Sequence, residues 1–109
     1  MQKLLQETQR PTAVIATSDL MAIGALQAAQ QAGIHVPRDL SIIGFDDINL
    51  CDVLDPPLTT IRLDRHEMAE EFARALETSA KDPHAPGKIY TIKTSLVIRN
   101  STGPARKSK

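Results

Sequence analysis

Carboxylates are the side chains in this sequence whose type and spacing come nearest to a chemical site. Asp46 and Asp47 are adjacent, and in an extended segment adjacent side chains point to opposite sides. They are therefore a poor general acid–base pair, because both groups would have to reach one substrate. One of the two can face a cleft while the other faces elsewhere. Asp46 is then either a ligand contact or a structural hydrogen-bond acceptor.

The other reactive residues give no sign of catalysis. Ser18 lies outside any G-x-S-x-G elbow, so helix capping or hydrogen bonding to a ligand explains it more simply. Cys51 has no activating partner in the sequence, and we interpret it as a half-buried structural thiol. His35, His66 and His84 lack metal-ligand spacing and are interpreted as surface residues. We expect a protein that is not an enzyme, with no metal and no cofactor.

Composition indicates one small domain with an aliphatic core. The chain has 109 residues, of which 41% are hydrophobic and only 3% aromatic. Such a composition is typical of buried parallel sheets, and it argues against single-stranded nucleic-acid binding, which needs aromatic stacking surfaces. Thirteen basic residues balance thirteen acidic ones. Several basic residues fall at the end, at Arg99, Arg106, Lys107 and Lys109, which predicts a solvated tail rather than a DNA-binding face.

Targeting signals are absent from these residues. The sequence has neither a signal peptide nor an apolar run of about eighteen residues. Its single cysteine cannot form an internal disulfide, which suits a reducing compartment. We therefore expect a cytoplasmic location and no membrane partner.

The first half of the chain has the pattern of a strand–helix–strand unit. A short apolar run at Ala13–Ala16 is followed by a helical segment at Leu20–Ala32 and a second apolar run at Leu40–Phe45. Such a unit has parallel strands and a right-handed crossover. Ligands collect at the carboxyl ends of parallel strands, where residues 17–19 and 46–47 lie here. The sequence thus predicts an α/β fold with polar groups on one rim.

The remaining residues predict further elements around this unit. They are a helix end at Met1–Gln9, a helical turn at Ile48–Leu54, strands at Leu58–Leu63 and Ile89–Ile98, and a helix from Asp64 to Ala80. Asp64 and Glu67 have capping-box spacing at the start of that helix. Its apolar residues repeat every four positions, at Met68, Phe72, Leu76 and Ala80, and form one stripe.

Four segments resemble the lactose/galactose-repressor (LacI/GalR) family of transcriptional regulators. They are PTAVIATSDLMAIGAL (11–26), GIHVPRDLSIIGFDD (33–47), PPLTTI (56–61) and LVIRNST (96–102). The segments follow the family's order and spacing over residues 10–102. The resemblance implies an incomplete periplasmic-binding-protein-like (type I) domain, with a parallel-sheet C-terminal lobe at 10–58. Residues 59–98 would supply a crossover strand, a helix and a strand to the N-terminal lobe, and residues 99–109 a tail.

The resemblance also implies roles for particular residues. Asp46 would contact an effector, a sugar or nucleobase-like molecule bound between the lobes, together with Ser18, where the family commonly has Asn. Asp19 would cap the following helix. A homodimer would form through Ile23, Leu26, Gln27, Gln30 and Leu54. Operator DNA would be bound only through a headpiece to which none of these residues corresponds, and the Phe72/Leu76 stripe would lack its usual cover.

The sequence thus favours the effector-sensing and dimerisation portion of a LacI-type repressor. One alternative is a fragment of a sugar-binding transport protein, which a signal peptide upstream of the chain would favour. Another is a truncated paralogue that acts only as a dimer partner.

Overall fold

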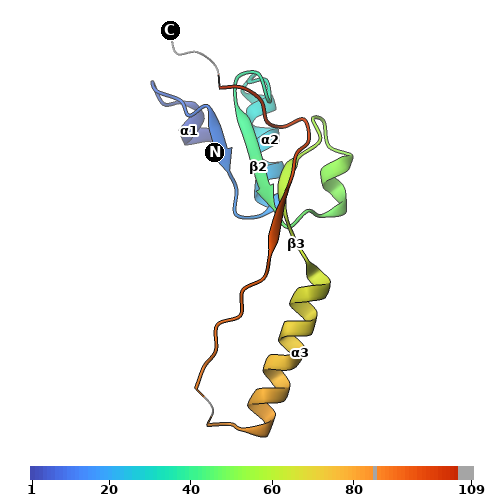
Figure 1. The fold of residues 1–109 in the computed structure, drawn as a ribbon. Coiled ribbons are helices and arrows are strands. Elements are labelled where there is room, and N and C mark those ends of the chain that lie inside the picture. Colours follow the sequence, from blue (N-terminus) through green and yellow to red (C-terminus); the bar gives the residue numbers. More distant parts are fainter. Residues whose placement is uncertain (85, 106–109) are drawn as a thin grey trace. The chain divides into compact units, whose positions relative to one another are not determined.

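The computed structural model describes residues 1–84 and 86–105, which fall into two compact units (Figure 1). Unit 1 contains residues 1–62 and the described residues from 96 onward, and unit 2 contains residues 63–95. Three basic residues of the predicted tail, Arg106, Lys107 and Lys109, lie outside the described residues. Their predicted solvation therefore stays a prediction.

Four strands form one sheet in the order β1-β2-β3-β4. They are β1 (Ala13–Ile15), β2 (Ser41–Phe45), β3 (Thr59–Leu63) and β4 (Thr94–Val97). β2 pairs in parallel with both β1 and β3, so that Val14 lies opposite Ile42 and Gly44 lies opposite Thr60. The predicted α/β class and the parallel strand–helix–strand unit are confirmed.

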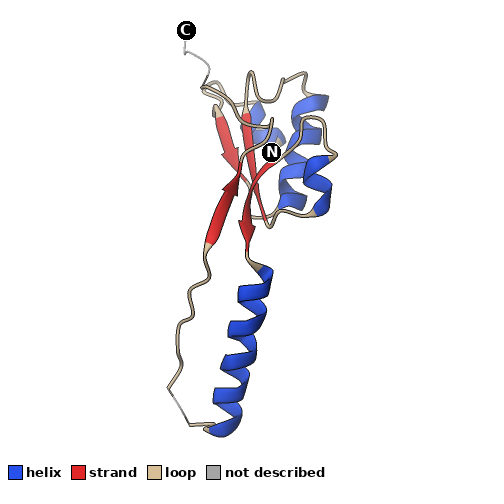
Figure 2. Cartoon of the chain, turned by 45° about the vertical axis from the view of Figure 1, so that its right-hand side comes forward, coloured by secondary structure: helices blue, strands red, loops and turns tan. Residues whose placement is uncertain are grey.

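The helix α2 (Asp19–Gln31) connects β1 to β2 and packs on the sheet. Ser18 precedes it, and the Ser18 hydroxyl accepts a hydrogen bond from the Met21 backbone N–H at 3.3 Å. Ala22 and Ala29 are fully buried, and their small side chains let the helix lie close to the buried Leu40 and Ile42. Figure 2 shows the helices of unit 1 on one side of its strands. The core is therefore aliphatic, as the composition predicts.

Two predicted elements are shorter in the structure. The helix expected at Met1–Gln9 is only α1 (Gln2–Leu5), which has no side-chain cap and no buried residue to stabilise it. The ten-residue strand expected at Ile89–Ile98 is only β4, because a strand needs a hydrogen-bonded neighbour and Ile89 is 92% exposed. The turn expected at Ile48–Leu54 contains the 3-10 helix η1 (Asn49–Asp52).

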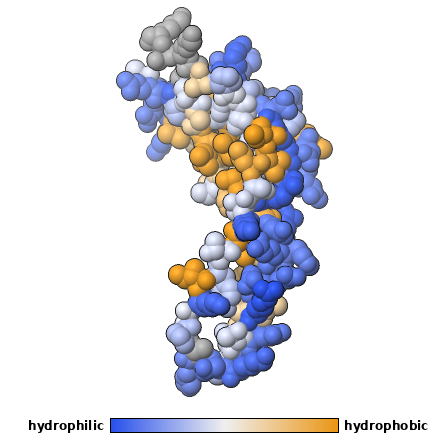
Figure 3. All heavy atoms as spheres, viewed as in Figure 1, coloured by the Kyte–Doolittle hydropathy of each residue, from blue (hydrophilic) through white to orange (hydrophobic). Residues whose placement is uncertain are grey.

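Unit 2 is built on the helix α3 (Arg65–Lys81). One Asp64 carboxylate oxygen accepts hydrogen bonds from the backbone N–H groups of His66 and Glu67, which begins the helix as its spacing predicts. None of its residues is buried, and Phe72 and Leu76 are 64% and 69% exposed. This stripe is therefore exposed within the chain, and apolar residues reach the surface of both units (Figure 3). No helix within the described residues is long and apolar enough to cross a membrane.

Candidate functional site

Polar residues follow β1 and β2 at the same edge of the sheet. Ser18 comes just after β1, while Asp46 and Asp47 come directly after β2. Because β1 and β2 run parallel, their carboxyl ends share one rim, as the sequence predicts. We call residues 17–19 and 46–47 the carboxyl rim. Ser18 and Asp46 are both half-buried there.

The backbone at Asp46 and Asp47 is a turn rather than an extended segment. Their φ angles are 115° and 52°, so the expectation that they alternate along a strand is wrong. Positive φ is uncommon for residues other than glycine and costs on the order of 1–3 kcal/mol at each position. The surrounding structure must therefore hold this turn, and one of its ties is the Asp46 N–H, which donates to the Ile61 carbonyl at 2.9 Å.

The Asp47 carboxylate is held by two arginines. Its side chain is 8% exposed, and its two oxygens accept hydrogen bonds from Arg62 Nε at 2.5 Å and from Arg99 Nη2 at 2.8 Å. Burial opposes ionisation of Asp47, but the hydrogen bonds from Arg62 and Arg99 outweigh it and lower the pKa. Asp47 thus has a structural task.

Arg99 connects several segments of unit 1. Besides Asp47, its guanidinium donates to Asp52 of η1 at 2.6 Å and to the Leu58 carbonyl at 2.9 Å. Burial opposes the charge of Arg99, yet its hydrogen bonds to Asp47 and Asp52 raise its pKa. The prediction that Arg99 belongs to a solvated tail is wrong, because its side chain is only 11% exposed. The local sequence around Arg99 gives no signal of these partners, which lie 41 to 52 residues away along the chain.

Residues just after Arg99 are also part of unit 1. Ser101 is fully buried, and its hydroxyl donates to the Ile42 carbonyl at 2.6 Å and accepts from the Thr59 N–H at 2.8 Å. The Gly103 N–H donates to the Ser41 hydroxyl at 3.1 Å. This segment therefore bridges β2 and the start of β3, which brings Arg99 to the rim.

Asp19 fixes the other side of the carboxyl rim. It is fully buried, and its carboxyl oxygens accept hydrogen bonds from Ile48 N–H at 2.9 Å, Cys51 Sγ at 3.2 Å and Thr60 Oγ1 at 2.5 Å. The expected capping role is wrong, because Ser18 is the cap and Asp19 lies one residue inside the helix. A Cβ atom on Gly44 would overlap Asp19 Oδ1, so glycine is required in β2 at this point.

Cys51 has the structural role that the sequence indicates, although it is fully buried rather than half-buried. Burial, together with the hydrogen bond to Asp19, raises the pKa of its thiol to about 12. A thiol in this state is not a nucleophile at neutral pH. His35, His66 and His84 are exposed, as predicted, and no group of side chains within the described residues could hold a metal ion.

The predicted interface residues lie on α2 and just after η1. Gln27 and Gln30 are exposed, and Ile23 and Leu54 are half-buried. Leu26 is the exception, because it is only 9% exposed and belongs to the core. Its side chain supports the helix from beneath and offers almost no surface to a partner.

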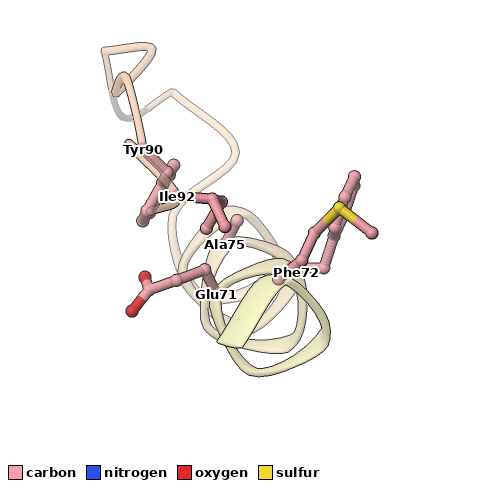
Figure 4. Close-up of a pocket in the computed structure, with 6 residues that line it drawn as sticks. Glu71, Phe72, Ala75, Tyr90 and Ile92 are labelled. Atoms are coloured by element: carbon pink, nitrogen blue, oxygen red, sulfur yellow. The ribbon is translucent and has the colours of Figure 1, made fainter. Parts of the chain in front are cut away.

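An apolar groove of about 290 Å³ lies in unit 2 (Figure 4). It is lined by Met68, Glu71, Phe72 and Ala75 of α3 and by Tyr90 and Ile92 of the returning segment. Figure 4 looks along α3. Ile92 lies next to Ala75 on one side of the helix, and Phe72 projects from the other side. Glu71 is the only charged residue in the lining, so the groove lacks the converging polar groups of an effector site.

A family model described as a periplasmic binding protein-like domain matches residues 1–102. The chain belongs to the periplasmic binding protein-like family. Its known relatives include regulators of the LacI type, as the four sequence motifs predict.

Three LacI-type proteins illustrate the likeness. The transcriptional repressor CytR of Escherichia coli strain K12 is 46% identical over 102 residues, which are 94% of this chain and 30% of CytR. A LacI-type regulator from Bacillus cereus subsp. cytotoxis superposes with a TM-score of 0.85 at 31% identity, over 95% of this chain and 37% of that one. A regulator from Enterococcus faecium with bound ribose gives 0.76 at 31% identity, over 95% and 38%. The chain thus spans about a third of the length of such proteins.

Acid should remove the contribution of Asp47 to stability. Because its folded-state pKa is lowered, that contribution is complete above the ordinary aspartate pKa of about 4 and is lost as pH falls through the lowered value. We expect Asp47→Asn to lower the free energy of unfolding by about 2 kcal/mol at neutral pH. The difference from the natural protein should shrink below about pH 4. Urea unfolding at a series of pH values measures this difference in the free energy of unfolding, with Asp55→Asn as an exposed control. A difference that does not depend on pH would contradict the structural role of the Asp47 carboxylate.

Proposed function

We propose that this chain is the effector-sensing and dimerisation part of a LacI-type transcriptional repressor. The observation that carries the proposal is the turn at Asp46 and Asp47, where two non-glycine residues adopt positive φ at the carboxyl rim. Strained backbone of this kind is concentrated at ligand sites. Membership in the family, whose relatives include a ribose-bound regulator, supports the same conclusion.

Asp46 is the residue to which we assign effector contact. Asp46 lies at the carboxyl rim, half-buried, on the turn whose second residue, Asp47, is held by two guanidinium groups. A carboxylate accepts hydrogen bonds at both oxygens and therefore suits a molecule with adjacent hydroxyl groups, such as a sugar. We infer a sugar or a nucleobase-like molecule as the effector class.

Ser18 is the second contact that we assign. Its oxygen already accepts a hydrogen bond from the Met21 N–H, and its own hydrogen can still be donated to a ligand. The side chain is shorter than the asparagine common in the family, so it reaches less far into the site. A small acceptor on the effector, such as a hydroxyl oxygen, fits this donor.

Self-association is the second half of the proposal. Gln27 and Gln30 of α2 are exposed and uncharged, and Val53, next to Leu54, is 75% exposed. Uncharged polar residues beside exposed apolar ones are typical of interfaces, because charges are depleted at their centres. We infer a homodimer through α2 and the segment around η1. For the whole repressor we infer operator DNA as a partner and the cytoplasm as its location. We assign DNA binding to residues outside this chain.

Removing the Asp46 carboxylate should weaken effector binding without harm to folding. Glycine accepts positive φ readily, so Asp46→Gly removes the carboxylate and relieves the backbone at the same time. We expect affinity for the effector to fall on the order of tenfold or more, with no fall in Tm. Calorimetry on the full-length protein with D-ribose, other sugars and nucleobases measures this. Glu77→Ala is the control, and unchanged affinity in Asp46→Gly would exclude the assignment.

Charge placed on the α2 surface should break the dimer. In a twofold interface every substitution occurs twice, so Gln27→Glu together with Gln30→Glu adds four like charges to one contact. We expect the dimer dissociation constant to rise on the order of tenfold or more. Sedimentation over a dilution series measures it, with Gln9→Glu as the control. Equal dissociation constants would exclude this surface. A dimer that binds none of the sugars or nucleobases would favour a role as dimer partner only.

A further inference from the structure

The turn at Asp46 and Asp47 needs a clamp, and the structure contains one. Two successive positive φ angles in non-glycine residues are unfavourable in isolation. The Asp46 N–H is held by the Ile61 carbonyl, which fixes the first residue of the turn through its backbone. The second residue is held through its side chain, by Arg62 and Arg99. The direction of the Asp46 side chain therefore depends on how firmly Asp47 is held.

Arg99 is suited to hold Asp47 because hydrogen bonds from its guanidinium and its backbone fix its own position. Its guanidinium donates from three nitrogens to three different segments: Nη2 to Asp47 after β2, Nε to Asp52 in η1, and Nη1 to the Leu58 carbonyl before β3. Its backbone N–H donates to Thr59 Oγ1 at 2.9 Å. A planar guanidinium with all of these bonds made has little freedom to turn.

Arg62 is a weaker clamp on the same carboxylate. Its side chain is 56% exposed, compared with 11% for Arg99. Exposed ion pairs contribute little, because water and salt screen them and long side chains lose entropy when they are held. Charge-assisted hydrogen bonds that are shielded from water are stronger. Arg62 makes the shorter contact with Asp47, at 2.5 Å compared with 2.8 Å, but Arg99 is shielded from water and tied to three segments, so Arg99 is the more firmly fixed of the two supports.

We propose that Arg99 is a positioning residue of the effector site, which fixes the direction of the Asp46 carboxylate by holding Asp47 in the turn. The proposal rests on the proposed function, in which Asp46 contacts the effector. Arg99 itself does not touch the effector. Its loss would leave Asp46 in place in the sequence while the turn that aims it becomes mobile.

The test compares Arg99→Gln and Arg99→Lys with the natural full-length protein. Hydrogen exchange at the Asp46 amide reports the turn directly, and calorimetry with D-ribose reports the site. We expect Arg99→Gln to speed exchange at this amide and to weaken ribose binding, each on the order of tenfold. Because Asp47 would lose one of the two guanidinium groups that lower its pKa, the acid limit of ribose binding should also move to higher pH. Arg99→Lys should restore part of each effect.

Two further variants keep the result decisive. Arg38 is also hydrogen-bonded to an aspartate, Asp39, but at an exposed place in the structure. Arg38→Lys should therefore change neither Asp46 exchange nor ribose binding. Asp47→Asn breaks the Arg99 contact from the other side and should speed exchange at Asp46 even if Arg99→Gln does not fold. A lower Tm with unchanged Asp46 exchange in the Arg99 and Asp47 variants would overturn the proposal. Faster exchange in a protein that binds no ribose would support the clamp and count against ribose as effector.

Discussion

The buried carboxyl group of Asp19 is the constraint on which unit 1 depends. A polar group removed from water must find hydrogen-bond partners, and a buried acid without them costs several kcal/mol. Asp19 finds its three donors at Ile48, just before η1, at Cys51 in η1 and at Thr60 in β3, which follow it in the chain by 29 to 41 residues. The amino end of α2, η1 and β3 are thereby fixed to one point. Gly44 lets Asp19 lie directly against β2.

A second polar centre, Arg99, extends this arrangement to the carboxyl rim. Asp19 binds the backbone of Ile48 and the side chain of Cys51, while Arg99 binds Asp47 and Asp52. The segment from 46 to 52 is therefore held from both sides, although it contains little regular structure. A short turn with unfavourable φ angles can persist there because the surrounding hydrogen bonds hold the backbone in that conformation. The proposed effector contact, Asp46, and the proposed dimer segment around η1 share this support.

What the sequence could predict depended on the range of the interactions involved. The strand–helix–strand unit, the Ser18 cap and the Asp64 cap follow from local patterns, since capping partners lie two or three residues away. The roles of Asp19 and Arg99 could not be predicted, because their partners are up to 52 residues distant and local preference does not indicate them. The turn at Asp46 was missed for the same reason: extended geometry is the default after a strand, and tertiary contacts overrule it here.

The most direct test of this account compares Asp19→Asn with Asp39→Asn by unfolding and by hydrogen exchange at the Ile48 amide. Asparagine has nearly the same shape as aspartate but only one acceptor oxygen, so it cannot serve the three donors that meet at Asp19. The account predicts that Asp19→Asn loses about 3 kcal/mol of stability and exchanges the Ile48 amide faster. Asp39→Asn, in an exposed turn, should change neither the stability nor the exchange of the Ile48 amide strongly. Equal stability of Asp19→Asn and the natural protein, with Ile48 still protected, would contradict it.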